Sequence, residues 1–249
     1  MLSKIKLILI LIVTSSIGIA QENEFDKEGK RHGLWKGNYE KSKNLRYEGT
    51  FEHGKEVGLF KFYADSKNKQ LMATRDFSKG DGSCYTVFYN GKFKVSEGDL
   101  VNKQPEGLWK YYHYRSDKIM NLENYKRGKL DGEKNVYYTN GQLAEKSYYK
   151  NNLLEGKYIK YAENGKPIEE SNFKNGELHG TAIFYDGEGN MLIKGQYKKN
   201  KKSGTWETYE NGKLVKKESA AEFSGKTFKL DNPNELEYKE ELKEEKNKK

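Results

Sequence analysis

The apolar positions from Gln21 to about Ser219 follow no helical period. Short segments rich in Tyr, Phe, Trp and β-branched residues alternate there with turn-forming Gly and Asn residues. Such segments are typical of β-strands, and an Asn-Gly turn such as Asn140-Gly141 is the strongest short signal for a hairpin. The pattern therefore predicts consecutive β-hairpins over this part of the chain.

One glycine position recurs every 24 or 25 residues, and we call its members the anchor glycines. They are Gly33, Gly58, Gly82, Gly107, Gly132, Gly156, Gly180 and Gly204. One repeat reads as strand, Asn-Gly turn, strand and second Gly-containing turn, with the anchor at the entry to the next strand. A left-handed or closely packed backbone there would explain the glycine. Self-similarity at this period indicates a repeat architecture.

Aromatic residues keep the register of the anchor glycines. Two residues after the anchor stand Trp35, Phe60, Trp109, Tyr158 and Trp206. Five residues after it stand Tyr63, Tyr112, Tyr137, Tyr161, Tyr185 and Tyr209. Because successive side chains of a strand point to opposite faces, both faces of the predicted sheet carry rings.

The repeats predict an all-β fold, an elongated single-layer antiparallel meander of about eight β-hairpins. About sixteen strands at roughly 4.8 Å spacing would give a sheet on the order of 75 Å long. Closure into a barrel is the alternative, because strand shear is invisible in a sequence. The third repeat departs from the pattern between Leu71 and Gly82, where a bulge or altered turn is expected. Cys84 stands there at the aromatic position.

Three regions are predicted along the chain. Residues 1–20 are typical of a signal peptide, since Lys4 and Lys6 accompany an apolar run that ends before Gly18-Ile19-Ala20. An uncleaved membrane anchor is the alternative. Residues 21–218 form the repeat array. Residues 219–249 read as a strand or cap at the sheet edge, followed by a charged helical or disordered tail.

Composition indicates a fold that is stabilised by aromatic side chains and needs little aliphatic interior. Hydrophobic residues make up 34% of the chain and the three aromatic types 13%, so rings must replace a large aliphatic core. A single cysteine rules out an intrachain disulfide. The net charge of +9 favours anionic partners, but the lysines are spread evenly and form no dense block. No nucleic-acid partner is expected.

Motifs for catalysis or metal binding are weak. None of the four histidines is spaced for metal ligation with another histidine or with Cys84. The stretch from Asp186 to Asn190 resembles the start of a calcium loop, but Tyr197 stands where the loop needs a glutamate. Glu169 and Glu170 are adjacent in a predicted strand and therefore point to opposite faces. We expect no cofactor, no metal and no enzymatic activity.

The repeat unit resembles the MORN repeat, in the bacterial variant grouped with YwqK-like "antitoxin" proteins. The residues that carry the resemblance are Gly107 to Tyr112, Phe173 to Gly180, Gly204-Thr205-Trp206 and Asn211 to Leu214. It covers roughly residues 25–217. The resemblance implies stacked β-hairpins and a non-catalytic role as a scaffold, dimerisation module or lipid-proximal binder.

We expect an exported protein, periplasmic or extracellular, that acts as a protein-interaction or scaffold module at the cell envelope. Binding of anionic glycan or phospholipid surfaces through aromatic and lysine side chains is the alternative, and so is a toxin-neutralising role. The residues expected to support the sheet, and secondarily to contact a partner, are Trp35, Trp109, Trp206, Tyr112, Tyr161 and Tyr209.

Overall fold

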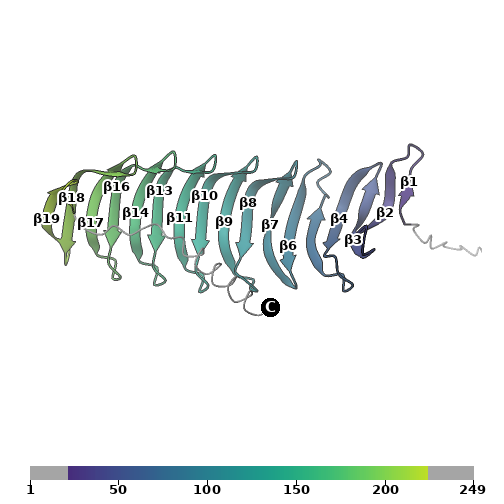
Figure 1. Cartoon of the computed structure of the whole chain (residues 1–249), viewed down its shortest axis with the longest axis horizontal. Helices are drawn as coiled ribbons and strands as arrows, with labels where there is room; N and C mark the ends of the chain where they lie inside the picture. The colour runs from purple at the N-terminus through teal and green to yellow at the C-terminus, as the bar shows by residue number, and fades with distance from the viewer. Residues whose placement is uncertain (1–21, 224–249) are drawn as a thin grey trace, which may run out of the picture.

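The computed structural model describes residues 22–223, and these form one long antiparallel sheet without a helix (Figure 1). The predicted signal peptide of residues 1–20 and the tail beyond residue 223 lie outside the described residues. The strands are β1 Glu24–Phe25, β2 Arg31–Asn38, β3 Leu45–Glu52, β4 Lys55–Tyr63, β5 Leu71–Asp76, β6 Cys84–Asn90, β7 Phe93–Val101, β8 Gln104–Tyr112, β9 Ile119–Lys126, β10 Lys129–Tyr137, β11 Leu143–Lys150, β12 Leu153–Leu154, β13 Gly156–Tyr161, β14 Pro167–Lys174, β15 Glu177–Leu178, β16 Gly180–Tyr185, β17 Met191–Lys198, β18 Lys201–Glu210 and β19 Lys213–Ser219.

The strands pair in chain order, from β1 at one edge to β19 at the other. The predicted single-layer meander is confirmed, and the barrel alternative is wrong because the two edge strands do not pair with each other (Figure 1). Two strands are interrupted, since β12 and β13 both pair with β11, and β15 and β16 both pair with β14. Among residues 22–223, no helix is long and apolar enough to cross a membrane.

The anchor glycines adopt a backbone conformation that other residues rarely adopt. All eight have positive φ, from 63° at Gly58 to 128° at Gly132. A side-chain β-carbon would meet no atom within 4 Å at six of them, so the backbone conformation, and not crowding, accounts for glycine there. The strand register shifts beside several anchors, for example between Glu97 and Asp99 opposite Gly107.

A second set of glycines lies under the large rings and was not singled out from the sequence. A β-carbon on Gly49, Gly98 or Gly195 would lie 2.3, 2.6 or 2.2 Å from the ring of Phe60, Trp109 or Trp206. Each of these glycines stands nine residues before an anchor, and each ring stands two residues after it. The rings therefore lie flat over the backbone of the neighbouring strand, and this contact makes deep burial possible without a second layer.

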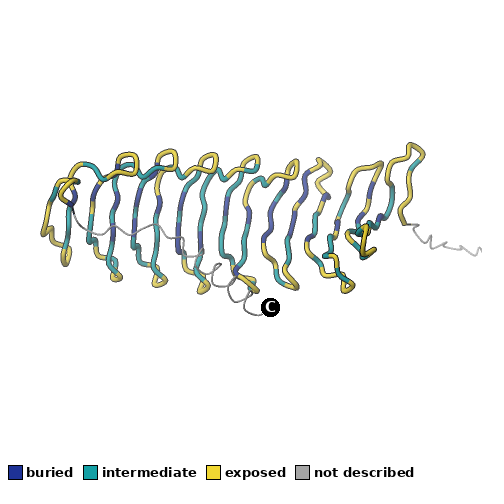
Figure 2. The backbone as a smooth tube through the Cα atoms, in the orientation of Figure 1, coloured by how far each residue is buried: buried dark blue, intermediate teal, exposed yellow. Residues whose placement is uncertain are grey.

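The two faces of the sheet differ in chemistry. We call the face with Trp35, Trp109 and Trp206 the aromatic face, and the face with Tyr63, Tyr112 and Tyr185 the tyrosine face. Buried residues concentrate in the middle of the strands, and exposed ones at the turns (Figure 2). The aromatic face holds two buried clusters. The first is Trp35, Phe51, Phe60, Phe77, Cys84, Leu100 and Trp109, and the second is Ala182, Phe184, Tyr197, Trp206 and Phe223.

Polar side chains fill the aromatic face between the two clusters. Glu123, Glu145 and Glu169 are all buried there. Lys134 forms an ion pair with Glu123 at 3.1 Å. In the strand register, Lys160 stands directly between Glu145 and Glu169. Charge pairing and hydrogen bonds therefore add in this middle part to the contact between the buried rings of Tyr158 and Phe173, whose centroids are 5.8 Å apart.

Hydrogen bonds that span one repeat hold consecutive hairpins together. The Tyr39 hydroxyl donates to the backbone carbonyl of Tyr63 at 2.8 Å, and the Tyr138 hydroxyl donates to the carbonyl of Tyr161 at 2.7 Å. At the opposite ends of the strands, the turns contact each other through backbone bonds, such as Asn152 N–H to the Leu130 carbonyl at 2.8 Å. Each repeat is thus positioned by its neighbours alone, as in solenoid proteins.

The third repeat has the altered turn that the sequence predicts. β5 ends at Asp76, and residues 77–83 form a loop in place of the tight turn found in the other repeats. The Asp76 and Asp81 carboxylates accept hydrogen bonds from the backbone N–H groups of Ser78 and Ser83. Phe77 packs on Phe60 at 5.4 Å between ring centroids, and Cys84 is buried in the first cluster.

The described chain ends on the aromatic face. After Ser219 the backbone turns, and the Phe223 ring lies 4.7 Å from the ring of Trp206. This contact lies at the start of the predicted edge cap and tail of residues 219–249, of which only residues up to Phe223 are described. The predicted division into leader, array and tail stays a prediction.

Candidate functional site

An open cleft lies on the aromatic face near the N-terminal end of the sheet and has a volume of about 340 Å³. Its central lining residues are Arg31, Arg46, Tyr47, Phe51, Phe60 and Phe62. Tyr39, Glu56, Tyr63 and Met72 line the rest. We call it the arginine cleft. Its residues come from β2 to β5 and from the turns that join them.

The floor of the cleft is aromatic. Phe51 in β3 meets Phe60 in β4 edge to face at 5.2 Å, and Phe60 stacks on Phe62 at 6.4 Å. The strand alternation puts Phe60 and Phe62 on the same face. Gly49 admits the ring of Phe60 against the backbone of β3. The floor is therefore rigid, because cross-strand packing fixes each ring.

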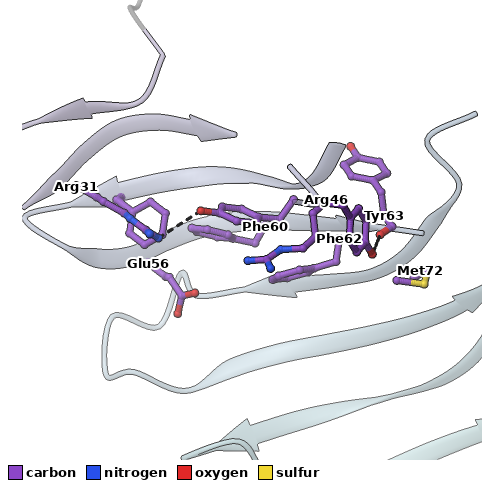
Figure 3. A pocket seen from close by; sticks show the side chains of 10 residues that line it. Arg31, Arg46, Glu56, Phe60, Phe62, Tyr63 and Met72 are labelled. Carbon is purple, nitrogen blue, oxygen red and sulfur yellow. Dashed lines mark hydrogen bonds between the residues drawn. The ribbon is translucent and has the colours of Figure 1, made fainter. Parts of the chain in front are cut away.

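Guanidinium groups lie against these rings (Figure 3). The Arg31 guanidinium lies 4.8 Å from the ring of Trp35 and 5.2 Å from that of Phe51, and it donates to the Tyr47 hydroxyl at 3.3 Å. The Arg46 guanidinium lies 5.5 Å from the Tyr47 ring. Stacking on a ring leaves the in-plane N–H donors of a guanidinium free for an anion.

The arginines lack acidic partners within the part of the chain that the structure describes. No carboxylate of residues 22–223 forms an ion pair with Arg31 or Arg46, although Glu56 lines the same cleft. A third arginine, Arg75, lies over the Phe62 ring at 5.0 Å, and its Nε is buried without a hydrogen-bond partner. Three of the five arginines in the sequence thus gather around one aromatic floor.

The cleft has the chemistry of a binding site for an anionic group attached to an apolar body. A guanidinium can bind a carboxylate or phosphate through two parallel hydrogen bonds, and the rings beside it accept an apolar side chain. Glu56 is the only carboxylate in the lining, and no lining residue pairs a nucleophile with a base.

The six predicted contact residues do not gather at one place. Trp35 lies next to the cleft under Arg31, whereas Trp109 and Trp206 are buried elsewhere on the aromatic face. The Trp109 indole N–H donates to the Asp99 carbonyl at 3.0 Å. Tyr112, Tyr161 and Tyr209 are half-buried on the tyrosine face. Tryptophans and tyrosines therefore cannot contact one partner surface together.

The tyrosine face is a network of paired charges. The Tyr63 hydroxyl donates to Glu48 at 2.6 Å, and Lys61 lies 3.6 Å from the same carboxylate. These contacts, with the Tyr63 hydrogen bond as the largest cause, hold the pKa of Glu48 below its usual value. Burial and the nearby Glu48 raise the pKa of Tyr63 to about 12. The lysines of this face are largely neutralised by their glutamate partners.

The arginine cleft was not predicted from the sequence, because the basic residues are spread evenly along the chain. One signal was available at Arg75, which stands seven residues before an anchor, where Phe51, Tyr125 and Phe173 carry rings. Pairing of Phe60 with Arg75 across β4 and β5 brings that charge onto the aromatic face. Recognition of the cleft needs this cross-strand register.

The histidines show a contact that their spacing did not suggest. The rings of His32 and His53 lie 5.0 Å apart, and His53 Nδ1 lies 2.7 Å from an Asp26 oxygen. Among residues 22–223, however, no three His, Cys, Asp or Glu side chains are placed to hold a metal ion.

Family comparison matches repeats in the C-terminal half of the array. Three consecutive segments match the MORN repeat variant. They are residues 130–151, 154–175 and 178–199, which start at the same position of successive 24-residue repeats. The MORN-type segments span β10 to β17 and include the polar part of the aromatic face. MORN repeats are commonly protein- or membrane-interaction modules and are typically non-catalytic. A comparison with curated proteins gave no match.

Proposed function

We propose that this protein is an exported, non-catalytic interaction scaffold at the cell envelope, and that its arginine cleft binds an acidic segment of a protein partner. The observation that carries the proposal is the pair of guanidiniums, Arg31 and Arg46, stacked on rings without acidic partners among residues 22–223. A stiff array of hairpins holds this cleft in fixed geometry. The match to MORN repeats supports a binding role.

A protein partner is favoured over an anionic lipid or glycan surface. Surface binding through aromatic and lysine side chains would need lysines that are free to meet phosphates or sulfates. On the tyrosine face, Lys61, Lys110 and Lys157 lie 3.6, 3.8 and 2.8 Å from glutamate oxygens. Arg31 and Arg46, which have no acidic partner among residues 22–223, lie instead in a cleft that is lined by rings. Such a cleft fits a side chain better than a membrane surface.

The proposal is tested by affinity capture from the producing cells. The Arg31→Ala/Arg46→Ala variant should lose the main captured protein, whereas the matched Arg115→Ala/Arg127→Ala variant should retain it, because these two arginines do not line the cleft. Equal capture by both variants would exclude the cleft as the binding site. Capture that falls steeply with salt for both variants would favour an anionic surface.

Export of the protein and the alternative toxin-neutralising role are tested by separate experiments. Cell fractionation and N-terminal sequencing should find the mature chain outside the cytoplasm and starting near Gln21. A cytoplasmic protein that retains Met1 would contradict export. A toxin-neutralising role predicts a neighbouring gene whose product is toxic alone and harmless when this protein is present.

A further inference from the structure

The two ends of this chain carry complementary chemistry. At the N-terminal end of the sheet lies the arginine cleft, with two stacked guanidiniums above an aromatic floor. At the other end, beyond the last described residue Phe223, the sequence contains the acidic segment DNPNELEYKEEL, residues 231–242. This segment has five carboxylates, one lysine and three apolar anchors. The anchors are Leu236, Tyr238 and Leu242.

We propose that residues 231–242 of one copy bind in the arginine cleft of a second copy, so that copies of this protein associate head to tail. This inference rests on the proposed function, because it names the acidic partner segment of the same cleft. Carboxylates such as Glu237 would take the in-plane donors of Arg31 and Arg46. A neighbouring tyrosine or leucine side chain would lie on the floor made by Phe51 and Phe60.

Charge complementarity supports this occupant. The segment has a net charge of −4 within a chain of net charge +9, so it is an acidic exception in a basic protein. The cleft lining has two arginines and one glutamate, Glu56, and the Arg75 guanidinium lies over the Phe62 ring of the floor at 5.0 Å. Lysines such as Lys61 and Lys157 are already paired with glutamates, so they compete less for the acidic segment than the two cleft arginines do.

Geometry favours a second copy over the same copy. Phe223 packs on Trp206 in β18, and about twelve strand spacings of roughly 4.8 Å separate β18 from β4, a span on the order of 58 Å. The fifteen residues from Phe223 to Tyr238 reach at most about 54 Å when fully extended. Tyr238 therefore falls short of the cleft of its own chain, and Leu242 reaches it only when the connecting residues are almost fully extended. The cleft of another copy imposes no such limit.

A head-to-tail contact of this kind is heterologous, so each dimer retains one free cleft and one free segment. Purified full chain should therefore associate with increasing concentration into dimers and longer oligomers. The association should weaken at high salt, because it depends on charges at an exposed site. Sedimentation velocity over a concentration series measures both effects.

Two full-chain variants test the contact by complementation. The cleft variant is Arg31→Ala/Arg46→Ala, and the segment variant is Glu235→Lys/Glu237→Lys/Glu240→Lys/Glu241→Lys. Each alone should associate at least tenfold more weakly than the unaltered chain. An equimolar mixture should form dimers and nothing longer, because one intact cleft meets one intact segment. Arg115→Ala/Arg127→Ala should associate like the unaltered chain, and circular dichroism should show every variant folded.

Three results would overturn the inference. These are an unaltered chain that stays monomeric up to about 100 μM, a segment variant that associates normally, and a mixture that stays monomeric. A labelled peptide of residues 231–242 adds a direct measurement and should bind the segment variant but not the cleft variant. If the peptide fails to bind while cellular capture still depends on Arg31 and Arg46, only self-association is wrong. If capture fails as well, the proposed function is also wrong.

Discussion

Two adjacent glutamates on opposite faces show how strongly the burial and the pKa of a side chain depend on the face of the sheet that it occupies. Glu169 is buried on the aromatic face, and burial raises its pKa although Ser171 and Lys160 act against the shift. Glu170 lies on the tyrosine face, where Lys157 at 2.8 Å and Tyr185 hold its pKa below the usual value. The sequence predicted the opposite faces, but only the packing decides which face excludes water.

The two glutamates have opposite effects on stability as the pH changes. The raised pKa of Glu169 means that the folded protein favours its neutral form. Its contribution to the free energy of unfolding is therefore present at low pH and is lost as the pH rises through the folded-state pKa. The lowered pKa of Glu170 means that its ionised form suits the fold, so its contribution is lost as the pH falls.

Glu169→Gln should stabilise the protein at neutral pH. One carboxylate oxygen accepts from the Ser171 hydroxyl at 2.5 Å, but Oε2 is buried without a hydrogen-bond partner within residues 22–223. A neutral amide keeps the size of the side chain and removes the buried charge. Thermal unfolding at pH 7 should show a Tm higher by a few degrees, and the difference from the unaltered protein should shrink near pH 4.

Glu145→Gln is the matched control. Both oxygens of Glu145 accept hydrogen bonds, from Ser147 at 3.0 Å and from Tyr158 at 3.3 Å. Its substitution should give no gain in Tm at pH 7. A gain of equal size for both variants would show that reduced net negative charge, and not the unpaired oxygen of Glu169, is the cause.

At the scale of the hairpin, the strands and turns could be predicted from the sequence, but the contact between glycines and large rings on neighbouring strands was missed. The anchor positions, the turns and the altered third repeat all follow from local residue types and a fixed period. The glycines under the rings need the register between two strands, because Gly98 and Trp109 are eleven residues apart. The same offset at Gly49 with Phe60 and at Gly195 with Trp206 was a usable signal.

Two alanine substitutions in one hairpin should therefore destabilise it for different reasons. Gly98→Ala places a β-carbon 2.6 Å from the Trp109 ring, whereas Gly107→Ala meets no atom within 4 Å but has a φ of 69°. Gly107→Ala should cost about 1–2 kcal/mol of strain. In a Trp109→Leu background, the cost of Gly98→Ala should largely disappear and that of Gly107→Ala should persist. Urea unfolding of the five variants measures these differences.

Equal costs of Gly98→Ala in both backgrounds would contradict the ring contact as the reason for this glycine. The comparison is a double-mutant cycle. A coupling energy larger than about 0.5 kcal/mol is expected only for Gly98 with Trp109, the pair in contact.

At the scale of the whole molecule, the predicted number of strands was close to the structure. About sixteen strands were predicted, and 19 are found, because β12 with β13 and β15 with β16 are halves of interrupted strands and β1 is a two-residue end piece. The order of strands could be predicted because each one pairs with its chain neighbours. The division of the aromatic face into two clusters could not be predicted, because it depends on which side chains the folded sheet excludes from water.

Removal of one whole repeat should leave a folded, shorter protein. Deletion of residues 156–179 joins Glu155 to Gly180, which is the next anchor, so register and faces are kept. The sheet should shorten by two strand spacings, about 10 Å, and this change is measurable by small-angle X-ray scattering. Deletion of residues 156–167 removes half a repeat and should unfold the array. If both deletions are equally disruptive, the repeats do not stabilise each other as separate units.

The placement of the three tryptophans makes this protein a natural fluorescence reporter of its own two buried clusters. Trp35 and Trp109 belong to the first cluster and Trp206 to the second, and no tryptophan lies in the polar middle. Indole emission will therefore respond to the two clusters and not to the repeats between β9 and β17, whereas the far-ultraviolet signal sums over all strands. Any gap between the two melting curves would be a direct optical measure of how separately the central repeats come apart.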